Sequence, residues 1–271
     1  MGYLWTKYLA GSGLKVQWFM WTVRFLKTGV PKEEMDTLAA GRYRSTTVFG
    51  HVFRTLQWLH PRLDEVHFSD RLQPWCAHPG MPKNIRSTID SFPVEADLRA
   101  TPKKMIKLLW NKKYGGSIWK ITAIFAITGA LLAYAIDYGN TGDSPALTAL
   151  LEKLKEQGFE FENGPPLEFS LADGAYGTAN PVDCHLLTPF NVIQLRKGSV
   201  EALAYNTWQR FYRSRAEHGV RRLKTLTVLR HITLPPQLVF VACSVALQIV
   251  NTEYRRFIPL PEQPPRPVAL R

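Results

Sequence analysis

The most conspicuous hydrophobic pattern is the run from Ile118 to Ile136, in which Lys120 is the only charged residue. Extended to residues 117–138, it has about 20 residues, the length that an α-helix needs to cross the hydrocarbon core of a bilayer. Trp119 lies near one end and Tyr138 at the other, as is typical of aromatic side chains at membrane–water interfaces. The pattern predicts one transmembrane helix over residues 117–138; the alternative is a buried helix of a soluble core.

Helical spacing also predicts amphipathic helices before this run. The stretch LKVQWFMWTVRFLKTG (14–29) carries large aromatic residues and predicts a helix that lies at a membrane interface or docks on protein. STTVFGHVFRTLQWLH (45–60) has apolar residues at helical spacing, and loops that contain proline follow it. Pro102 then begins a basic amphipathic helix, KKMIKLLWNKK, which leads into the predicted span.

Two further helices are predicted after the run. SPALTALLEKLKEQG has Pro145 at its first helical position and Gly158 as its stop. Residues 159–192 are rich in turn residues and predict an extended surface region. A second helix is predicted from Ser199 to about His218, before the basic stretch VRRLKTLTVLRH.

A second apolar run, residues 232–250, is interrupted by Pro235 and Pro236. Counted from Gln237 it has 14 residues, which is short for a membrane span and typical of a core or interfacial helix. A second crossing of the membrane remains the alternative for residues 237–250.

These patterns predict a mainly α fold: a single-span membrane protein with amphipathic N-terminal helices, a turn-rich loop region and a C-terminal helical segment. The predicted segments are a basic aromatic N-terminal segment (1–32), a loop-rich helical region (33–101), a basic juxtamembrane helix (102–116), the transmembrane helix (117–138), an acidic helix with an extended region (139–195), a basic helical region (196–258) and a Pro-rich tail (259–271).

Charge adds an orientation to this picture. The chain has a net charge of +12, which indicates an anionic partner. Residues 99–120 hold seven basic residues and no acid, whereas residues 137–183 hold nine acids and two lysines. By the positive-inside rule the N-terminal side stays in the cytoplasm-like compartment. In a mitochondrion that compartment is the matrix, and the residues after 138 would face the intermembrane space.

Basic and aromatic residues before and at the start of the run are candidates for binding anionic phospholipid such as cardiolipin. Such clusters attract anionic lipid at about 1 kcal/mol per Lys or Arg near the surface. The candidates are Lys103, Lys104, Lys107, Trp110, Lys112, Lys113, Trp119 and Lys120.

One face of the predicted span consists of small residues. Small side chains let helix backbones approach closely in lipid, so this face is a candidate for packing on a neighbouring helix. Its members are Thr122, Ala126, Gly129, Ala130 and Ala133.

The search for catalytic or metal-binding residues gives little. Cys76 and His78, with Cys184 and His185, could supply zinc ligands, but they lack the usual spacing of a zinc or iron–sulfur site. No phosphate-binding loop, dinucleotide fingerprint or metalloprotease motif is present. No catalytic residue, metal or cofactor is therefore expected.

The sequence-based hypothesis is a non-catalytic accessory subunit of an energy-transducing complex (respiratory chain or ATP synthase) in the mitochondrial inner membrane. Its expected partners are other subunits of that complex and anionic phospholipid, and nucleic acid is not expected. The alternatives are an organellar ribosomal protein that binds rRNA through phosphate contacts, and a membrane enzyme with an unrecognised site.

Overall fold

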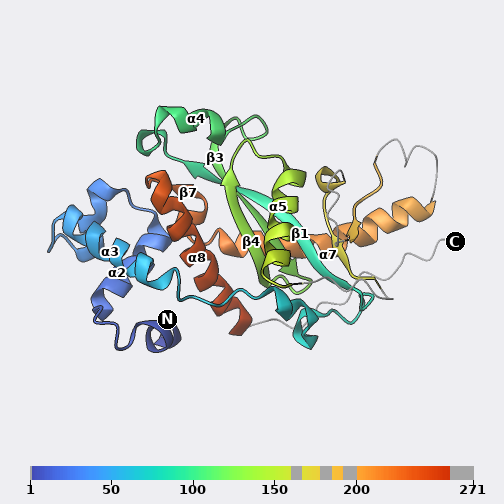
Figure 1. Ribbon diagram of the computed structural model, residues 1–271, viewed down its shortest axis with the longest axis horizontal. Helices are drawn as coiled ribbons and strands as arrows, with labels where there is room; N and C mark the ends of the chain where they lie inside the picture. The colour runs from blue at the N-terminus through green and yellow to red at the C-terminus, as the bar shows by residue number, and fades with distance from the viewer. Residues whose placement is uncertain (1, 160–166, 178–184, 192–199, 257–271) are drawn as a thin grey trace.

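The computed structural model describes residues 2–159, 167–177, 185–191 and 200–256 (Figure 1). It has a helical N-terminal part and a larger part built on a curved mixed sheet. The N-terminal part contains α1 (Gly2–Leu4), the π-helix η1 (Trp5–Leu9), α2 (Val16–Thr28), the 3-10 helix η2 (Lys32–Ala39) and α3 (Ser45–Leu59). The short helices η3 (Phe68–Leu72) and η4 (Pro74–Cys76) lead to the sheet.

The sheet has the order β2-β3-β1-β5-β6, with β4 on β3 and β7 on β1. Its antiparallel strands are β1 (Ile85–Ala96), β2 (Trp110–Asn111), β3 (Gly116–Ala126) and β4 (Leu131–Tyr138). The strands β5 (Phe169–Leu171) and β7 (His231–Ile232) run parallel to β1, and β6 (His185–Leu187) runs parallel to β5. The long strand β1 is therefore central, with an antiparallel neighbour on one side and a parallel neighbour on the other.

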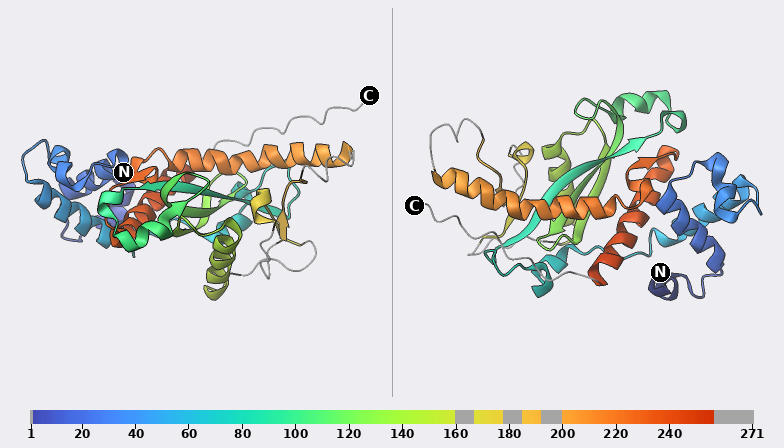
Figure 2. Two further views of the ribbon diagram at one scale, coloured as in Figure 1. Left: turned by 90° about the horizontal axis from the view of Figure 1, so that it is seen from above. Right: turned by 180° about the vertical axis from the view of Figure 1, so that it is seen from behind.

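Helices cover both faces of this sheet (Figure 2). One face carries α7 (Val200–Leu223) and α8 (Pro236–Arg256), which share a core with Phe92, Ile121 and Phe125. The opposite face carries α5 (Asp143–Glu156), whose leucines pack with Ile89 and Ile124. The remaining elements are η5 (Leu98–Ala100), α4 (Lys103–Leu109), η6 (Gly174–Tyr176) and η7 (Thr227–Leu229).

The prediction of a transmembrane helix over residues 117–138 is wrong, and with it the mainly α single-span fold. These residues form β3 and β4, joined by a turn in which the Ala126 N–H bonds the Ala130 carbonyl (2.8 Å) and Gly129 has a φ of 93°. A strand that is covered on both faces consists almost entirely of apolar residues, so its hydropathy resembles that of a membrane span. None of the described helices is both long and apolar enough to cross a membrane.

The residues of the predicted helix-packing face lie in this hairpin. Thr122 and Ala126 are in β3, Gly129 and Ala130 are in the turn, and Ala133 is in β4. Ala126, Ala130 and Ala133 belong to the core shared with α5, whereas Gly129 approaches α7, so these small residues pack within this molecule.

The other helix predictions fare better. The helices predicted from residue 144 and from residue 199 are confirmed as α5 and α7, although α7 continues to Leu223. The apolar run after Pro236 is a helix of the core, one of the two predicted possibilities, and α8 is longer than predicted, with 21 residues.

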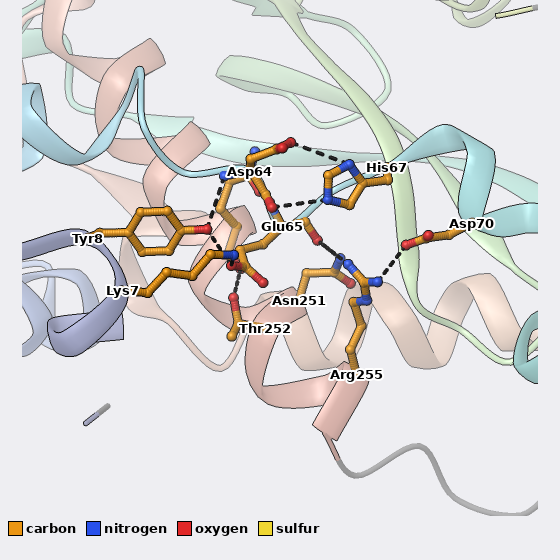
Figure 3. Close-up of polar contacts among 10 residues, drawn as sticks. Lys7, Tyr8, Asp64, Glu65, His67, Asp70, Asn251, Thr252 and Arg255 are labelled. Atoms are coloured by element: carbon orange, nitrogen blue, oxygen red, sulfur yellow. Dashed lines mark hydrogen bonds and ion pairs between the residues drawn. The ribbon is translucent and has the colours of Figure 1, made fainter. Parts of the chain in front are cut away.

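A polar cluster fastens the N-terminal helices to α8 (Figure 3). The buried carboxylate of Glu65 accepts hydrogen bonds from Lys7 (2.7 Å) and Tyr8, and its backbone N–H donates to Gln248 (2.8 Å). Asn251 of α8 donates to the Glu65 carbonyl (2.7 Å). Since the members of this cluster bond to one another, it serves as a structural joint.

The packing of α7 on the sheet requires a glycine at position 219. A Cβ there would lie 2.7 Å from the Phe125 ring and 3.0 Å from the Gly129 carbonyl. We therefore expect Gly219→Ala to lower the free energy of unfolding by about 1–3 kcal/mol, as overpacking usually does. Chemical denaturation would measure this.

Gly50 in α3 is the matched control, because a Cβ there meets nothing within 4 Å. Gly50→Ala should stabilise by about 0.5–1 kcal/mol through helix propensity alone. Equal effects of the two substitutions would contradict the close packing of α7.

Candidate active site

An acidic residue, Asp90, stands in the middle of the central strand β1, on the face that α7 covers. Its carboxylate accepts a hydrogen bond from the Ser91 N–H (2.9 Å). Burial raises the pKa of this carboxyl; the Ser91 N–H and the Arg213 charge lower it, and Glu217 and Asp173 raise it further. Asp90 has no ion-pair partner within 4 Å among the described residues. A half-buried carboxylate that makes no direct ion pair and lies near other acids is costly, and this marks Asp90 as a functional candidate.

Asp173 lies near Asp90 because β5 pairs with β1. Thr88 of β1 pairs with Leu171 of β5, in parallel. Asp90 lies two residues further along β1, whereas β5 ends at Leu171 and Asp173 lies two residues beyond that end. Asp173 is close enough to raise the pKa of Asp90. Asp173 also caps η6, where its Oδ1 accepts from the Gly174 N–H (2.6 Å).

Helix α7 supplies a third carboxylate, Glu217. The buried stripe of α7 consists of Gln209, Tyr212, Ala216, Gly219 and Leu223. Glu217 follows Ala216 at the edge of this stripe, close enough to affect the pKa of Asp90. Its side chain is 53% exposed and forms an ion pair with Arg213 (3.3 Å).

The three acids are the donor set that a hard divalent cation prefers, since Mg²⁺ binds carboxylate oxygens. In the part of the chain that the structure describes, no three His, Cys, Asp or Glu side chains already stand as a ligand group. Glu217 is turned toward Arg213 in an exposed ion pair, and such pairs contribute at most about 1 kcal/mol. The residue types therefore suit a divalent cation, although in this structure Glu217 pairs with Arg213 and the three acids do not form a ligand group.

Basic groups border these acids. Arg213 lies on α7 within reach of Asp90 and Glu217. Lys224, just after α7, lies over the Phe92 ring (5.5 Å); burial lowers its pKa, while Asp90 and Glu95 act in the opposite direction. A site with carboxylates at its centre and cations at its rim can bind a cation and an anionic substrate together.

Two other buried ion pairs have structural roles. Arg71 donates from Nε and Nη2 to the two oxygens of Glu168 (2.6 and 3.1 Å), and both side chains are buried. Lys120 forms an ion pair with Asp143 (2.5 Å) and donates to the Thr141 carbonyl. Burial also raises the pKa of Asp137, but Asp90 differs in having two further carboxylates close enough to raise its pKa.

The structure divides the predicted lipid-binding residues into two groups. Six lie on one exposed projection at the end of the sheet: Lys103, Lys104, Lys107, Trp110, Lys112 and Lys113. Trp119 and Lys120 are buried in β3. Lipid binding by the first group remains a prediction.

The zinc candidates do not form a group among the described residues. Cys76 and His78 are buried next to a cavity of about 280 Å³, and His185 begins β6 on the surface. Cys184 lies outside the described residues.

Comparison with known proteins gives no relative: no family model, curated protein or solved structure matches the chain. The site therefore has to be judged from its own residues.

The raised pKa of Asp90 predicts a specific pH dependence of stability. Because the folded protein holds this proton more tightly than the unfolded chain, stability falls as the pH rises from the ordinary Asp range through the raised pKa. Asp90→Asn should therefore raise the melting temperature at pH 7 and have little effect at pH 3.

Asp64→Asn is the control for this substitution, because the Asp64 side chain is 76% exposed. It should change the melting temperature little at either pH. A loss of stability in Asp90→Asn at pH 7 would contradict the unpaired state of this carboxylate.

Proposed function

We propose that this protein binds double-stranded DNA and cleaves or transfers its phosphodiester bonds with divalent cations held by Asp90, Asp173 and Glu217. The observation that carries the proposal is the meeting of three acids: β5 pairs with β1, and Asp173, just past the end of β5, and Glu217 of α7 both lie close enough to Asp90 to raise the pKa of its carboxyl. This reverses the expectations that the chain has no metal, catalytic residue or nucleic-acid partner.

Divalent cations in such a site lower the pKa of a bound water and stabilise the charge of a phosphoryl group in transfer. A hydroxyl of water or of a strand end attacks the phosphorus, a new P–O bond forms, and the P–O bond opposite it breaks. The attacking hydroxyl gives its proton to solvent, and the leaving oxygen takes one from water. Asp90, Asp173 and Glu217 would hold the cation, and Arg213 and Lys224 would bind the phosphates on either side of it.

The N-terminal helices support DNA as the substrate. Helices η2 and α3 are joined by five residues, 40–44, in which Ala40 and Gly41 have positive φ (51° and 71°). Ser45 fixes the start of α3 against η2: its Oγ lies 2.8 Å from the Glu33 carbonyl and accepts from the Asp36 N–H (3.3 Å). The arrangement resembles a helix-turn-helix, in which the second helix lies in the major groove, although η2 is a 3-10 helix and the turn is one residue longer than usual.

The exposed side of α3 suits a groove of DNA. Residues 41–63 contain four arginines and no acid. The residues of α3 that point to solvent are Thr46, Thr47, Gly50, Arg54 and Gln57. Arg and Gln make paired hydrogen bonds to guanine and adenine edges in the major groove of B-DNA. The major groove of an RNA duplex is too narrow for side chains to contact the bases, so this arrangement favours DNA.

The accessory-subunit hypothesis depended on a membrane span in residues 117–138. Since those residues form β3 and β4, the hypothesis loses its principal support, and so does the location derived from it. The prediction that the exposed lysines of residues 103–113 bind anionic phospholipid does not depend on a membrane span, and binding to vesicles tests it.

The cleavage proposal predicts a divalent-cation requirement. With Mg²⁺ or Mn²⁺ the purified protein should nick or cut duplex DNA, and EDTA should abolish the reaction. Asp90→Asn and Asp173→Asn should each lower the rate by about 100-fold or more, because each removes a cation ligand. Asp90→Asn should also lose the Mn²⁺-induced rise in melting temperature.

Asp64→Asn, an exposed acid outside the site, should keep full activity. Cleavage that persists unchanged in both Asp90→Asn and Asp173→Asn would refute this site. A protein that shows neither Mn²⁺ stabilisation nor cleavage would refute the function.

The role of α3 is tested by binding. On a duplex selected from a random pool, Arg54→Ala should weaken binding by about 10-fold or more, since a good base contact contributes about 1–3 kcal/mol. Arg62→Ala removes the same charge beyond the end of α3, where Arg62 stacks on Trp58 (3.6 Å), and should have a smaller effect. Equal losses in the two variants would indicate charge attraction without base contacts.

A further inference from the structure

A basic projection extends from the end of the sheet and has no part in the proposed catalytic site. This basic arm consists of residues 102–116: α4, β2, the turn after it and the first residue of β3. Its lysines, Lys103, Lys104, Lys107, Lys112 and Lys113, are all exposed. No Asp or Glu occurs between residues 98 and 136.

The arm also exposes two large aromatic side chains. Trp110 is 53% exposed and Tyr114 is 43% exposed. Lys113 Nζ lies 5.5 Å from the centre of the Tyr114 ring. Aromatic rings of this size are usually buried, so two of them exposed among five lysines indicate a surface that is covered by a ligand.

The arm is held firmly on the sheet. Trp110 and Asn111 pair with the start of β3, and Leu109 is fully buried. The Asn140 N–H donates to the Leu108 carbonyl (3.0 Å), and a Cβ on Gly139 would lie 2.2 Å from the Leu109 carbonyl. The lysines and the aromatic rings are therefore presented from a fixed base.

Strand β1 connects the arm with the candidate active site. From Asp90 to Ala96 the strand rises by about 20 Å, and α4 begins seven residues later. Two cations lie along this stretch: Lys224 over Phe92, and the exposed Arg230, whose carbonyl accepts from the Glu95 N–H (2.8 Å). Acids lie on this stretch too: Glu95 faces His231 (3.7 Å) and Asp97 pairs with Arg99 (2.7 Å). The strand from Asp90 to Ala96 has the length of about six nucleotides of one DNA strand at about 3.4 Å each.

We infer that the basic arm binds an unpaired DNA strand that leads away from the active site. The lysines attract the phosphates, and Trp110 and Tyr114 stack on bases, the combination that proteins use to bind single strands. Paired bases are stacked within the duplex and do not offer their faces to these rings. The inference rests on the proposed function for its ligand and for the position of the active site, but binding of a single strand to the arm requires neither the three acids nor the cation.

Binding to the arm can be measured without catalysis. The full chain with Asp90→Asn, in EDTA, would be titrated into a labelled 20-nucleotide oligo(dT) and into a duplex of the same length, with fluorescence anisotropy as the readout. Trp110→Ala should weaken oligo(dT) binding by about 10-fold and duplex binding much less. Trp110→Phe, which keeps a ring, should restore most of the affinity.

The lysines have a matched control on the other side of the sheet. Lys112→Gln/Lys113→Gln should weaken oligo(dT) binding and reduce its salt dependence, because two phosphate contacts are lost. Lys153→Gln/Lys155→Gln makes the same charge change on α5 and should have little effect. Melting temperatures of all variants would confirm that each is folded.

Two outcomes would overturn the inference. If the Trp110→Ala variant binds oligo(dT) normally, or if the substitution weakens binding to the duplex as much as binding to oligo(dT), the arm does not stack on unpaired bases. If the arm variants lose binding only to vesicles of anionic and zwitterionic phospholipid, the arm is a membrane-binding surface. Failure of DNA cleavage with intact oligo(dT) binding would refute the proposed function and leave this inference standing.

Discussion

The close contact of α7 with the sheet is the constraint on which the rest of the larger part depends. At Gly219 the helix backbone lies so near Phe125 and the Gly129 carbonyl that no side chain fits between them. This contact sets the distance between α7 and the strands β1 and β3. It buries Ala216 and Leu223 in the core shared with α8, and it sets Glu217 and Arg213 at the edge of the helix, beside Asp90. The same packing that closes the core therefore builds the candidate site.

The helices outside the sheet could be predicted because their signals are local. Pro145 and Gly158 mark the ends of the α5 pattern, and the apolar spacing of residues 45–60 is sufficient to predict α3. The sheet could not be predicted in this way. A central strand covered by α7 on one face and α5 on the other shows no alternation of apolar and polar residues. Two signals did favour strands: the many β-branched residues between Ile118 and Ile127, and Gly129 in the middle of the run, where a hairpin turns.

The three acids carry no motif, which is why the sequence alone did not bring them together. Asp90 and Asp173 are separated by 83 residues, and Asp173 and Glu217 by 44. Only the register of β5 on β1 and the packing of α7 join them. A weaker signal was available in IRSTIDSFPVEA, where an acid stands within a stretch that otherwise has strand character. Burying a carboxylate in a strand lowers the stability of the fold, so an acid at such a position indicates a functional role.

The positions of the charged residues in the fold show where the net charge of +12 would act on an anionic partner. Positive charge is concentrated on the basic arm, along α7 and in the turn before α3, whereas Asp90, Asp173 and Glu217 form a negative centre within it. A polyanion would be attracted by these basic surfaces and repelled where its phosphate would meet the three carboxylates. A divalent cation bound at that point removes the repulsion. DNA binding and cation binding should therefore favour each other, because each supplies the charge that the other requires.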